Sequence, residues 1–329
     1  MDVHGKWSRR SVLSAAGLTA AAAVVGTPGT AEAAVPSNGR FDLAASLVDP
    51  PLLWKTPLQN QTVMQSFAWD PTNNYLYTIQ CRNGEGHLGN LVVTARPGTS
   101  SQSYMVLYGF GHGVTLGIER ASSTTGLYLW AESHSGSVPE GEDAFGTRIS
   151  RVAWSTNGRV STTSAGVQER TPPEAVDRSP RPIVDQKNNL LIVRYTYGSG
   201  YRFDAYPITD AAKDIWTNRV YRTDVPKPSG TSQGTTVYGG YVYLYYGNAY
   251  SSTNPYPGNT TLYAYKIVDG GAATLSETKL TEAYKSLDFR EPEGLAVYKP
   301  RSTAPILGFG FASGPAGDRL ATIAGKPQV

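Results

Sequence analysis

Five segments of the chain repeat one pattern, and this repetition constrains the fold more than any other feature. Each segment begins with a polar or small residue, continues with four or five strand-like residues and a turn, and ends in an aromatic-rich strand. The segments are residues 65–80, 113–132, 181–197, 233–247 and 293–312. Their starts lie roughly 50 to 70 residues apart, a spacing typical of propeller blades with loop insertions.

Weaker hairpins lie between the repeated segments. They cover residues 89–109, 147–165, 201–221 and 261–280, and the turn signals among them are Pro-Gly, Asn-Gly and Gly-Gly. Each hairpin supplies a third and a fourth strand, so the sequence predicts an all-β, five-bladed β-propeller with four-stranded antiparallel blades. Radial repetition of this kind leaves few exposed sheet edges. A six-bladed ring with one degenerate blade and a β-sandwich are the alternatives.

The last repeat is short of strands, and the start of the chain offers the missing one. Residues 40–57 are expected to return as the outer strand of the last blade and close the ring. The predicted domain, residues 34–329, is then a single propeller.

The first 33 residues resemble an export signal. The paired Arg9 and Arg10 precede an apolar run from Val12 to Val25, and Ala31-Glu32-Ala33 fits the pattern that a signal peptidase cleaves. A twin arginine before a modest apolar region is typical of a Tat leader. A transmembrane anchor is the alternative, but the run is shorter than the roughly 20 apolar residues that span a bilayer. We therefore expect a secreted, extracellular or wall-associated protein without a stable membrane anchor after cleavage.

The net charge limits the classes of binding partner, and the cysteine content limits how the fold is stabilised. The net charge is +3 and 17% of the residues are charged, too weak a balance to predict nucleic acid as a partner. The single cysteine, Cys81, forms no internal disulfide, so the hydrophobic core must hold the fold together.

Polar residues recur where each repeat begins, and this is the strongest functional signal in the sequence. The innermost strand of each blade lines the central channel, so the segments entering these strands meet at one mouth of the ring. A blade core needs no polar groups there, and we expect a shared ligand site at that mouth. The entry residues with site roles are Gln65, His112, Arg181, Gln233, Arg290, Glu291 and Glu293.

Three of the four histidines fall on the predicted rim. His112 lies between two glycines in "GFGHGVTLGIE", and it either shapes a turn or faces the site with Glu119 or Glu293 orienting its ring. His87 and His134 lie on turns that flank the same mouth. No HxH or HxxxH spacing supports a metal site, so no metal and no cofactor are predicted, although a divalent cation is left open.

Carboxylates and tyrosines are the remaining candidates. Asp70 and Asp185 lie in the turn sequences "DPTNN" and "DQKNN". Without them Glu119 and Glu293 have no third carboxylate for glycoside hydrolysis of the propeller type. Tyr250, on a long loop rich in Tyr, Pro and Asn, is placed to stack on sugar rings.

Three motifs carry a family resemblance. The stretches "MQSFAWDPTNNYLYTIQ", "GFGHGVTLGIE" and "EPEGLAVY" resemble the β-propeller shared by teichoic acid biosynthesis protein C and receptor-binding proteins of staphylococcal phages. The likeness runs from about Val63 to Phe311. It implies a five-bladed propeller that recognises a wall glycopolymer, with teichoic acid as the natural candidate. The export leader and the lack of a tail-attachment region depart from the phage pattern and resemble exported actinobacterial proteins.

Two functions follow as hypotheses. In the first, the funnel of the propeller binds an extracellular polysaccharide or wall glycopolymer without cutting it. In the second, the protein is a polysaccharide lyase that cuts an anionic glycan. The lyase would use His112, His87 and Tyr195 as acid and base, and Arg181 would neutralise the uronate carboxylate. Hydrolysis is a further alternative.

Overall fold

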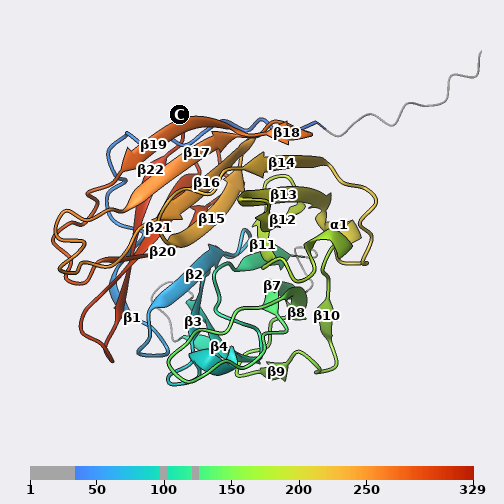
Figure 1. Cartoon of the computed structure of the whole chain (residues 1–329), viewed down its shortest axis with the longest axis horizontal. Helices are drawn as coiled ribbons and strands as arrows, with labels where there is room; N and C mark the ends of the chain where they lie inside the picture. The colour runs from blue at the N-terminus through green and yellow to red at the C-terminus, as the bar shows by residue number, and fades with distance from the viewer. Residues whose placement is uncertain (1–33, 97–101, 121–125) are drawn as a thin grey trace, which may run out of the picture. The chain divides into compact units, whose positions relative to one another are not determined.

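The computed structural model describes residues 34–96, 102–120 and 126–329. The predicted signal peptide, residues 1–33, lies outside these described residues. In the described part the strands form five separate sheets, each ordered from an inner to an outer strand. In Figure 1 the inner strands β2, β11, β15 and β20 gather near the middle of the view, and β9, β10, β14 and β19 lie toward the periphery. The prediction of a five-bladed all-β propeller is confirmed.

Each blade runs from an inner strand to an outer strand. Blade 1 comprises β2 (Met64–Trp69), β3 (Leu76–Cys81), β4 (Leu91–Arg96) and β5 (Ser103–Tyr108). Blade 2 comprises β6 (Gly117–Arg120), β7 (Leu127–Ser133), β8 (Arg148–Ala153) and β10 (Val167–Glu169). Blade 3 comprises β11 (Arg181–Asp185), β12 (Leu190–Tyr197), β13 (Gly200–Pro207) and β14 (Tyr221–Val225).

The last two blades follow the same order. Blade 4 comprises β15 (Ser232–Tyr238), β16 (Tyr241–Tyr246), β17 (Thr261–Lys266) and β19 (Thr274–Leu280). Blade 5 comprises β20 (Glu291–Tyr298), β21 (Ile306–Ser313), β22 (Leu320–Pro327) and β1 (Leu53–Pro57). Helical structure in the described residues is limited to η1 (Gly86–Leu88), η2 (Pro173–Ala175) and α1 (Ile208–Ala211), and none of these is long or apolar enough to cross a membrane.

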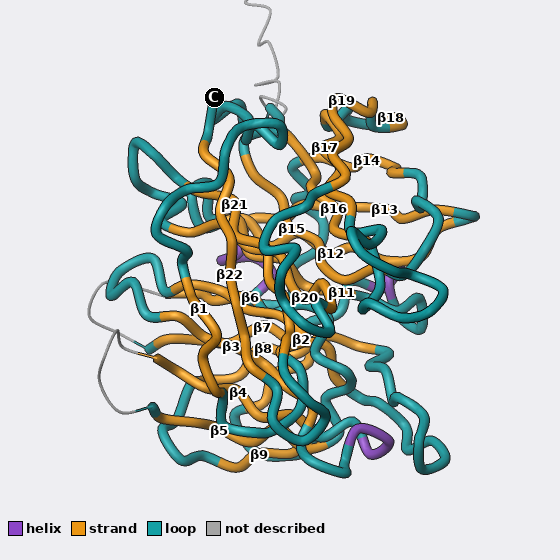
Figure 2. The backbone as a smooth tube through the Cα atoms, turned by 90° about the vertical axis from the view of Figure 1, so that its left-hand side faces the viewer, coloured by secondary structure: helices purple, strands orange, loops and turns teal. Residues whose placement is uncertain are grey.

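Two blades carry a fifth strand that the sequence did not predict. The short strands β9 (Arg159–Ser161) and β18 (Gly271–Ala272) pair in parallel with β5 and β14. Figure 2 shows β5 and β9 side by side. The segment after the Asn157-Gly158 turn therefore extends the neighbouring blade 1, and β10 completes blade 2 in its place. The prediction of four-stranded antiparallel blades is confirmed for most of the ring, but the expected place of residues 159–161 as the fourth strand of blade 2 was wrong. Strand β5 has an unpaired edge, and this segment pairs with it.

The predicted ring closure is confirmed. Strand β1 pairs antiparallel with β22, so the start of the described chain supplies the outer strand of the last blade. Upstream, Phe41 forms a bridge with Gln328 and buries its ring completely. Its backbone N–H also donates to the Tyr243 hydroxyl at 3.0 Å. The closing segment is thus anchored in blade 4 as well as in blade 5.

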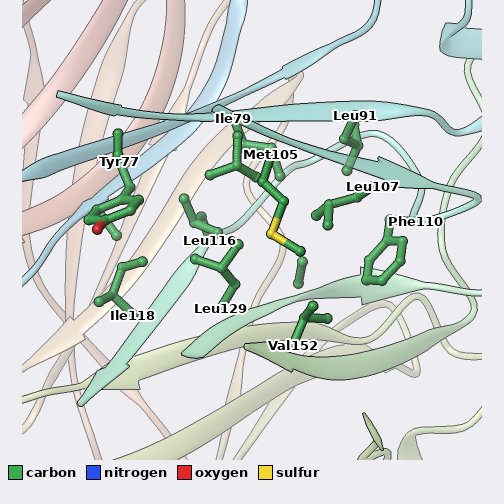
Figure 3. Close-up of a cluster of buried hydrophobic side chains, with 14 of the residues drawn as sticks. Tyr77, Ile79, Leu91, Met105, Leu107, Phe110, Leu116, Ile118, Leu129 and Val152 are labelled. Atoms are coloured by element: carbon green, nitrogen blue, oxygen red, sulfur yellow. The ribbon is translucent and has the colours of Figure 1, made fainter. Parts of the chain in front are cut away.

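Hydrophobic contact between neighbouring blades forms the core. The buried apolar side chains fall into five clusters, and each lies between two adjacent blades. In Figure 3 the cluster between blades 1 and 2 brings Ile79, Met105 and Leu107 against Ile118 and Leu129. The aromatic strands predicted from the repeats therefore face the next blade, as the alternation of a pleated strand requires.

The two "D-x-x-N-N" turns lie at the far end of inner strands, away from the entry segments. The Asp70 carboxylate accepts the Thr72 N–H at 2.9 Å and pairs with Arg120, and Asp185 accepts the Lys187 N–H at 3.0 Å. Both carboxylates are used in local turns.

Candidate functional site

An open pocket of about 730 Å³ lies at the mouth of the propeller where the inner strands begin. This volume is in the range of small-ligand sites. The space between the inner strands further into the ring is only about 40 Å³, so a ligand is confined to the mouth. The polar and aromatic side chains that line the pocket are Gln61, Thr62, Gln65, Asn83, His112, Asp143, Phe145, Thr231, Ser232, Gln233, Glu291, Glu293 and Arg319.

Three blades place a polar side chain in this pocket by the same device, a β-bulge at the start of the inner strand. In blade 1 the pairing shifts between Met64 and Ser66, which leaves Gln65 as the extra residue. In blade 4 the shift between Ser232 and Gly234 does the same for Gln233. Bulges re-aim side chains and are common beside functional sites.

The bulge of blade 5 spans Glu293 and Gly294. The pairing shifts between Pro292 and Leu295, and Gly294 has a φ of +77°. A Cβ at Gly294 would lie 2.8 Å from the Phe67 ring, so this bulge requires glycine. The predicted site residues Gln65, Gln233 and Glu293 therefore line one pocket, each by a shift in strand register.

His112 lines the same pocket from the entry to blade 2. Its Nδ1 lies 3.4 Å from the Asp143 carboxylate and 3.6 Å from Cys81 Sγ, and its ring packs 4.8 Å from the Phe145 ring. Burial alone would lower the pKa of His112, but the hydrogen bond to Asp143 and the contact with Cys81 outweigh burial and raise the pKa. The same hydrogen bond lowers the pKa of Asp143. His112 is thus held as one half of an ion pair.

The contacts of His112 argue against a Cys–His–Asp relay. A relay needs the nucleophile on one ring nitrogen and the orienting carboxylate on the other. Here both the thiol and the carboxylate approach Nδ1. Of the two carboxylates expected beside His112, Glu119 is engaged elsewhere, since it pairs with Arg151 and accepts the Trp130 indole N–H at 2.7 Å. Glu293 lines the same pocket as His112.

Glu132, which the sequence did not single out, holds the His112 loop in place. This fully buried carboxylate accepts the backbone N–H groups of Gly113 and Gly146 at 2.7 and 2.6 Å. It also accepts the Val114 N–H at 3.1 Å and lies 3.2 Å from Arg181 Nη1. Glu132 therefore ties the entry to blade 2 to the loop that carries Phe145 and to the inner strand of blade 3.

Glu293 differs from every other buried carboxylate in the described ranges. Each of the others has a hydrogen-bond or ion-pair partner: Asp70, Glu119, Glu132, Asp185 and Asp204. Glu293 is 3% exposed and borders the pocket, yet no described residue donates a hydrogen bond to it or pairs with its charge. A mostly buried side chain whose carboxylate borders the pocket without a protein partner is expected where a ligand supplies that partner.

Burial controls the protonation of this carboxylate. Burial raises the pKa of Glu293 well above its ordinary value, and the charge of the neighbouring Glu291 raises it further. Burial also raises the pKa of Glu291, against the opposing effect of Arg319. The pair forms an acidic floor that has a high affinity for protons.

Glu293→Gln is expected to stabilise the ligand-free protein at pH 8 by about 1–3 kcal/mol. The pKa of Glu293 is raised on folding, so its contribution to stability is present below the unfolded pKa and is lost as pH rises through the folded pKa. The glutamine side chain has nearly the same shape as that of Glu293 but carries no titratable proton, so it avoids the cost of a buried charge at pH 8. Urea unfolding at pH 4 and pH 8 tests this, and the gain should disappear at the lower pH. A variant no more stable than the parent chain at pH 8 contradicts it.

The four residues predicted for lyase chemistry do not assemble into one site. Only His112 lines the pocket. Tyr195 lies in the cluster between blades 2 and 3, and its hydroxyl donates to Asp204 at 2.8 Å. Arg181 is 3% exposed and is paired with Glu132 behind Phe145. His87 lies on η1, outside the pocket lining. Tertiary packing turned Tyr195 and Arg181 toward buried carboxylates.

Three of the predicted binding residues also lie outside the pocket lining. Arg290 is fully buried and donates to the Ala283 and Thr281 carbonyls, so it braces loops. The Tyr250 hydroxyl donates to the Lys285 carbonyl at 3.1 Å. His134 has a left-handed backbone and its Nδ1 lies 3.1 Å from the Ser133 hydroxyl.

Loop residues complete the pocket, and the sequence pattern did not predict them as site residues. Asp143 and Phe145 come from the β7–β8 loop, and Arg319 comes from the β21–β22 hairpin. They belong to connections without a repeated pattern, and only the acidic-aromatic "EDAFG" stretch hints at a site. In the described part of the chain, no three His, Cys, Asp or Glu side chains are grouped so as to hold a metal ion.

Comparison with known proteins identifies relatives of this arrangement. A family model described as the phage 5-bladed beta propeller receptor binding platform domain matches residues 63–325. The putative major teichoic acid biosynthesis protein C of Bacillus subtilis (strain 168) is 27% identical over 287 residues, which cover 84% of this chain and 62% of that protein. The tail fiber of Staphylococcus aureus phage P68 superposes with a TM-score of 0.64 at 20% identity and covers 84% of this chain. The chain spans 62% and 52% of the lengths of these two proteins.

Proposed function

The chain belongs to the family of phage five-bladed β-propeller receptor-binding platform domains, and on that premise we propose that it binds a cell-surface glycopolymer of the teichoic acid class. Binding takes place in the mouth pocket, defined by Gln65, His112, Gln233, Glu291 and Glu293. The relative named as a putative teichoic acid biosynthesis protein supports this polymer class, and the receptor-binding family supports recognition of a cell surface.

The observation that carries the proposal is the set of three register bulges that turn Gln65, Gln233 and Glu293 into one pocket. Amide and carboxyl groups at such positions are suited to the hydroxyl groups of sugars and polyols, since they both donate and accept hydrogen bonds. Phe145 is 46% exposed at the same pocket and offers a ring face for stacking. A polar floor with one aromatic wall is typical of carbohydrate binding.

We also propose that the protein is exported. The supporting feature is the paired Arg9 and Arg10 followed by an apolar run and Ala31-Glu32-Ala33. Export would bring the pocket to wall polymers outside the membrane.

Binding is tested by co-sedimentation of the purified chain with Gram-positive cell walls before and after extraction of teichoic acids. We expect retention on intact walls and loss of retention after extraction. The double variant Gln65→Ala, Gln233→Ala should weaken retention by about tenfold or more, because at least two hydrogen bonds are removed.

Gln102→Ala is the matched control, since Gln102 is exposed and lies outside the pocket lining. It should bind like the parent chain. Equal retention on intact and extracted walls would overturn the proposed polymer class, and equal retention by the double variant would overturn the assignment of the pocket.

A further inference from the structure

We propose that the floor of the mouth pocket is a subsite for a primary ammonium group carried by the polymer, in an aminoacyl ester or an unacetylated amino sugar. This inference rests on the proposed function and names the chemical group that the pocket selects. The residues that form the subsite are Glu291 and Glu293, with Gln65 and Gln233 beside them in the pocket.

The first support is that no cation of the described chain pairs with Glu293, whereas most other buried carboxylates have an arginine partner. Four of the buried carboxylates in the described ranges pair with arginine, as Glu119 does with Arg151 and Asp204 with Arg222. Asp185 is satisfied by its own turn instead. Glu293 has neither arrangement and borders the pocket. A cation from outside the chain would complete it as arginine completes the others.

The second support is that the nearby cations are already engaged. The Arg319 guanidinium lies 3.4 Å from the centre of the Phe289 ring and donates to the Gly314 carbonyl. His112 is paired with Asp143. The floor therefore holds two carboxyl groups with which no described cation pairs; an ammonium group bound there favours their ionised forms, and ionised carboxylates oppose a phosphate group.

Donor count favours an ammonium group over a single hydroxyl. A primary ammonium has three donors and no acceptor, whereas an ionised carboxylate only accepts. Two carboxylates and the side-chain oxygens of two glutamines can receive all three donors without leaving one unpaired.

The test compares ligands that share one ring and differ in one substituent. Glucosamine, N-acetylglucosamine, glucose and glucose 6-phosphate are titrated into the full-length chain by calorimetry at about pH 6.5, where the amine is protonated. We expect glucosamine to bind about tenfold or more tightly than N-acetylglucosamine and glucose, and glucose 6-phosphate to bind most weakly. Alanine methyl ester against its N-acetyl form repeats the comparison for the ester source.

Glu293→Gln should reduce glucosamine affinity by about tenfold or more and leave glucose affinity within about twofold. Glu142→Gln is the control for loss of one carboxylate, because Glu142 is exposed and outside the pocket lining. It should bind both sugars like the parent chain.

The two proposals fail in different ways. Equal affinity for charged and acetylated ligands, or unchanged glucosamine binding by Glu293→Gln, overturns the ammonium subsite. Wall retention that is lost with teichoic acid extraction would still support the proposed function in that case. Tight glucosamine binding with no retention on intact walls would instead support the ammonium subsite and overturn the proposed polymer class.

Discussion

Glu132→Gln is expected to lower the free energy of unfolding by about 3–5 kcal/mol, the usual cost of breaking a buried ion pair by changing one partner. The carboxylate accepts from Gly113, Val114 and Gly146 and faces Arg181. The amide of glutamine replaces one acceptor oxygen by a donor. That donor would face other donors, and Arg181 would lose the carboxylate with which it pairs.

The same substitution should disturb ligand binding. Glu132 does not line the pocket, yet it holds the entry loop that carries His112. We expect weaker wall retention at temperatures where the variant is still folded, with a lower midpoint in urea. Glu142→Gln, on an exposed loop, should change stability by less than about 0.5 kcal/mol. A Glu132→Gln protein that unfolds at the same urea midpoint as the parent chain would show that Glu132 does not hold the entry to blade 2 in place.

Phe41→Ala is expected to cost about 3–5 kcal/mol of stability, as truncation of a buried phenylalanine usually does. The ring is fully buried between Tyr238 and Tyr243, with ring centres at 5.1 and 5.4 Å. Phe41 also leads the segment that closes the ring through β1 and β22. Its loss removes the anchor of that closure in blade 4.

Urea unfolding measures this effect, and Trp54→Ala is the control from the same segment. Trp54 is 47% exposed, and its ring approaches that of Tyr284 edge-on at 5.1 Å, so its truncation should cost about 1 kcal/mol. If both variants lose the same small amount, ring closure does not depend on Phe41.

Most of the architecture was predictable because the blades repeat. Each repeat shows its turn residues and alternating aromatic residues locally, and residues 40–57, which precede the first repeat, were expected to complete the last blade, which is short of strands. The extra strands β9 and β18 were not predictable in the same way. They pair in parallel with strands of distant sequence position, and a segment of two or three residues carries no periodic signal.

The sequence predicted part of the candidate site correctly, namely residues whose place in the pocket follows from strand order. Gln65, Gln233, Glu291 and Glu293 line the pocket because they begin inner strands, and strand order follows from the repeats. Arg181 and Arg290 begin inner strands too, but their charges were neutralised or buried by neighbours that only the fold brings near. A long side chain can reach several surroundings, and sequence position does not select among them.

From the amino-acid sequence alone, the repeats favour five blades and predict the closing segment and the ring of polar entries, because these depend on local periodicity and on order along the chain. Tertiary structure decided which polar entries remain unpaired. A charged side chain pairs with whichever opposite charge the fold brings close to it, and that charge can come from a different blade. Glu132 finds Arg181 across blades 2 and 3, while Glu293 finds no described partner and is left facing the pocket.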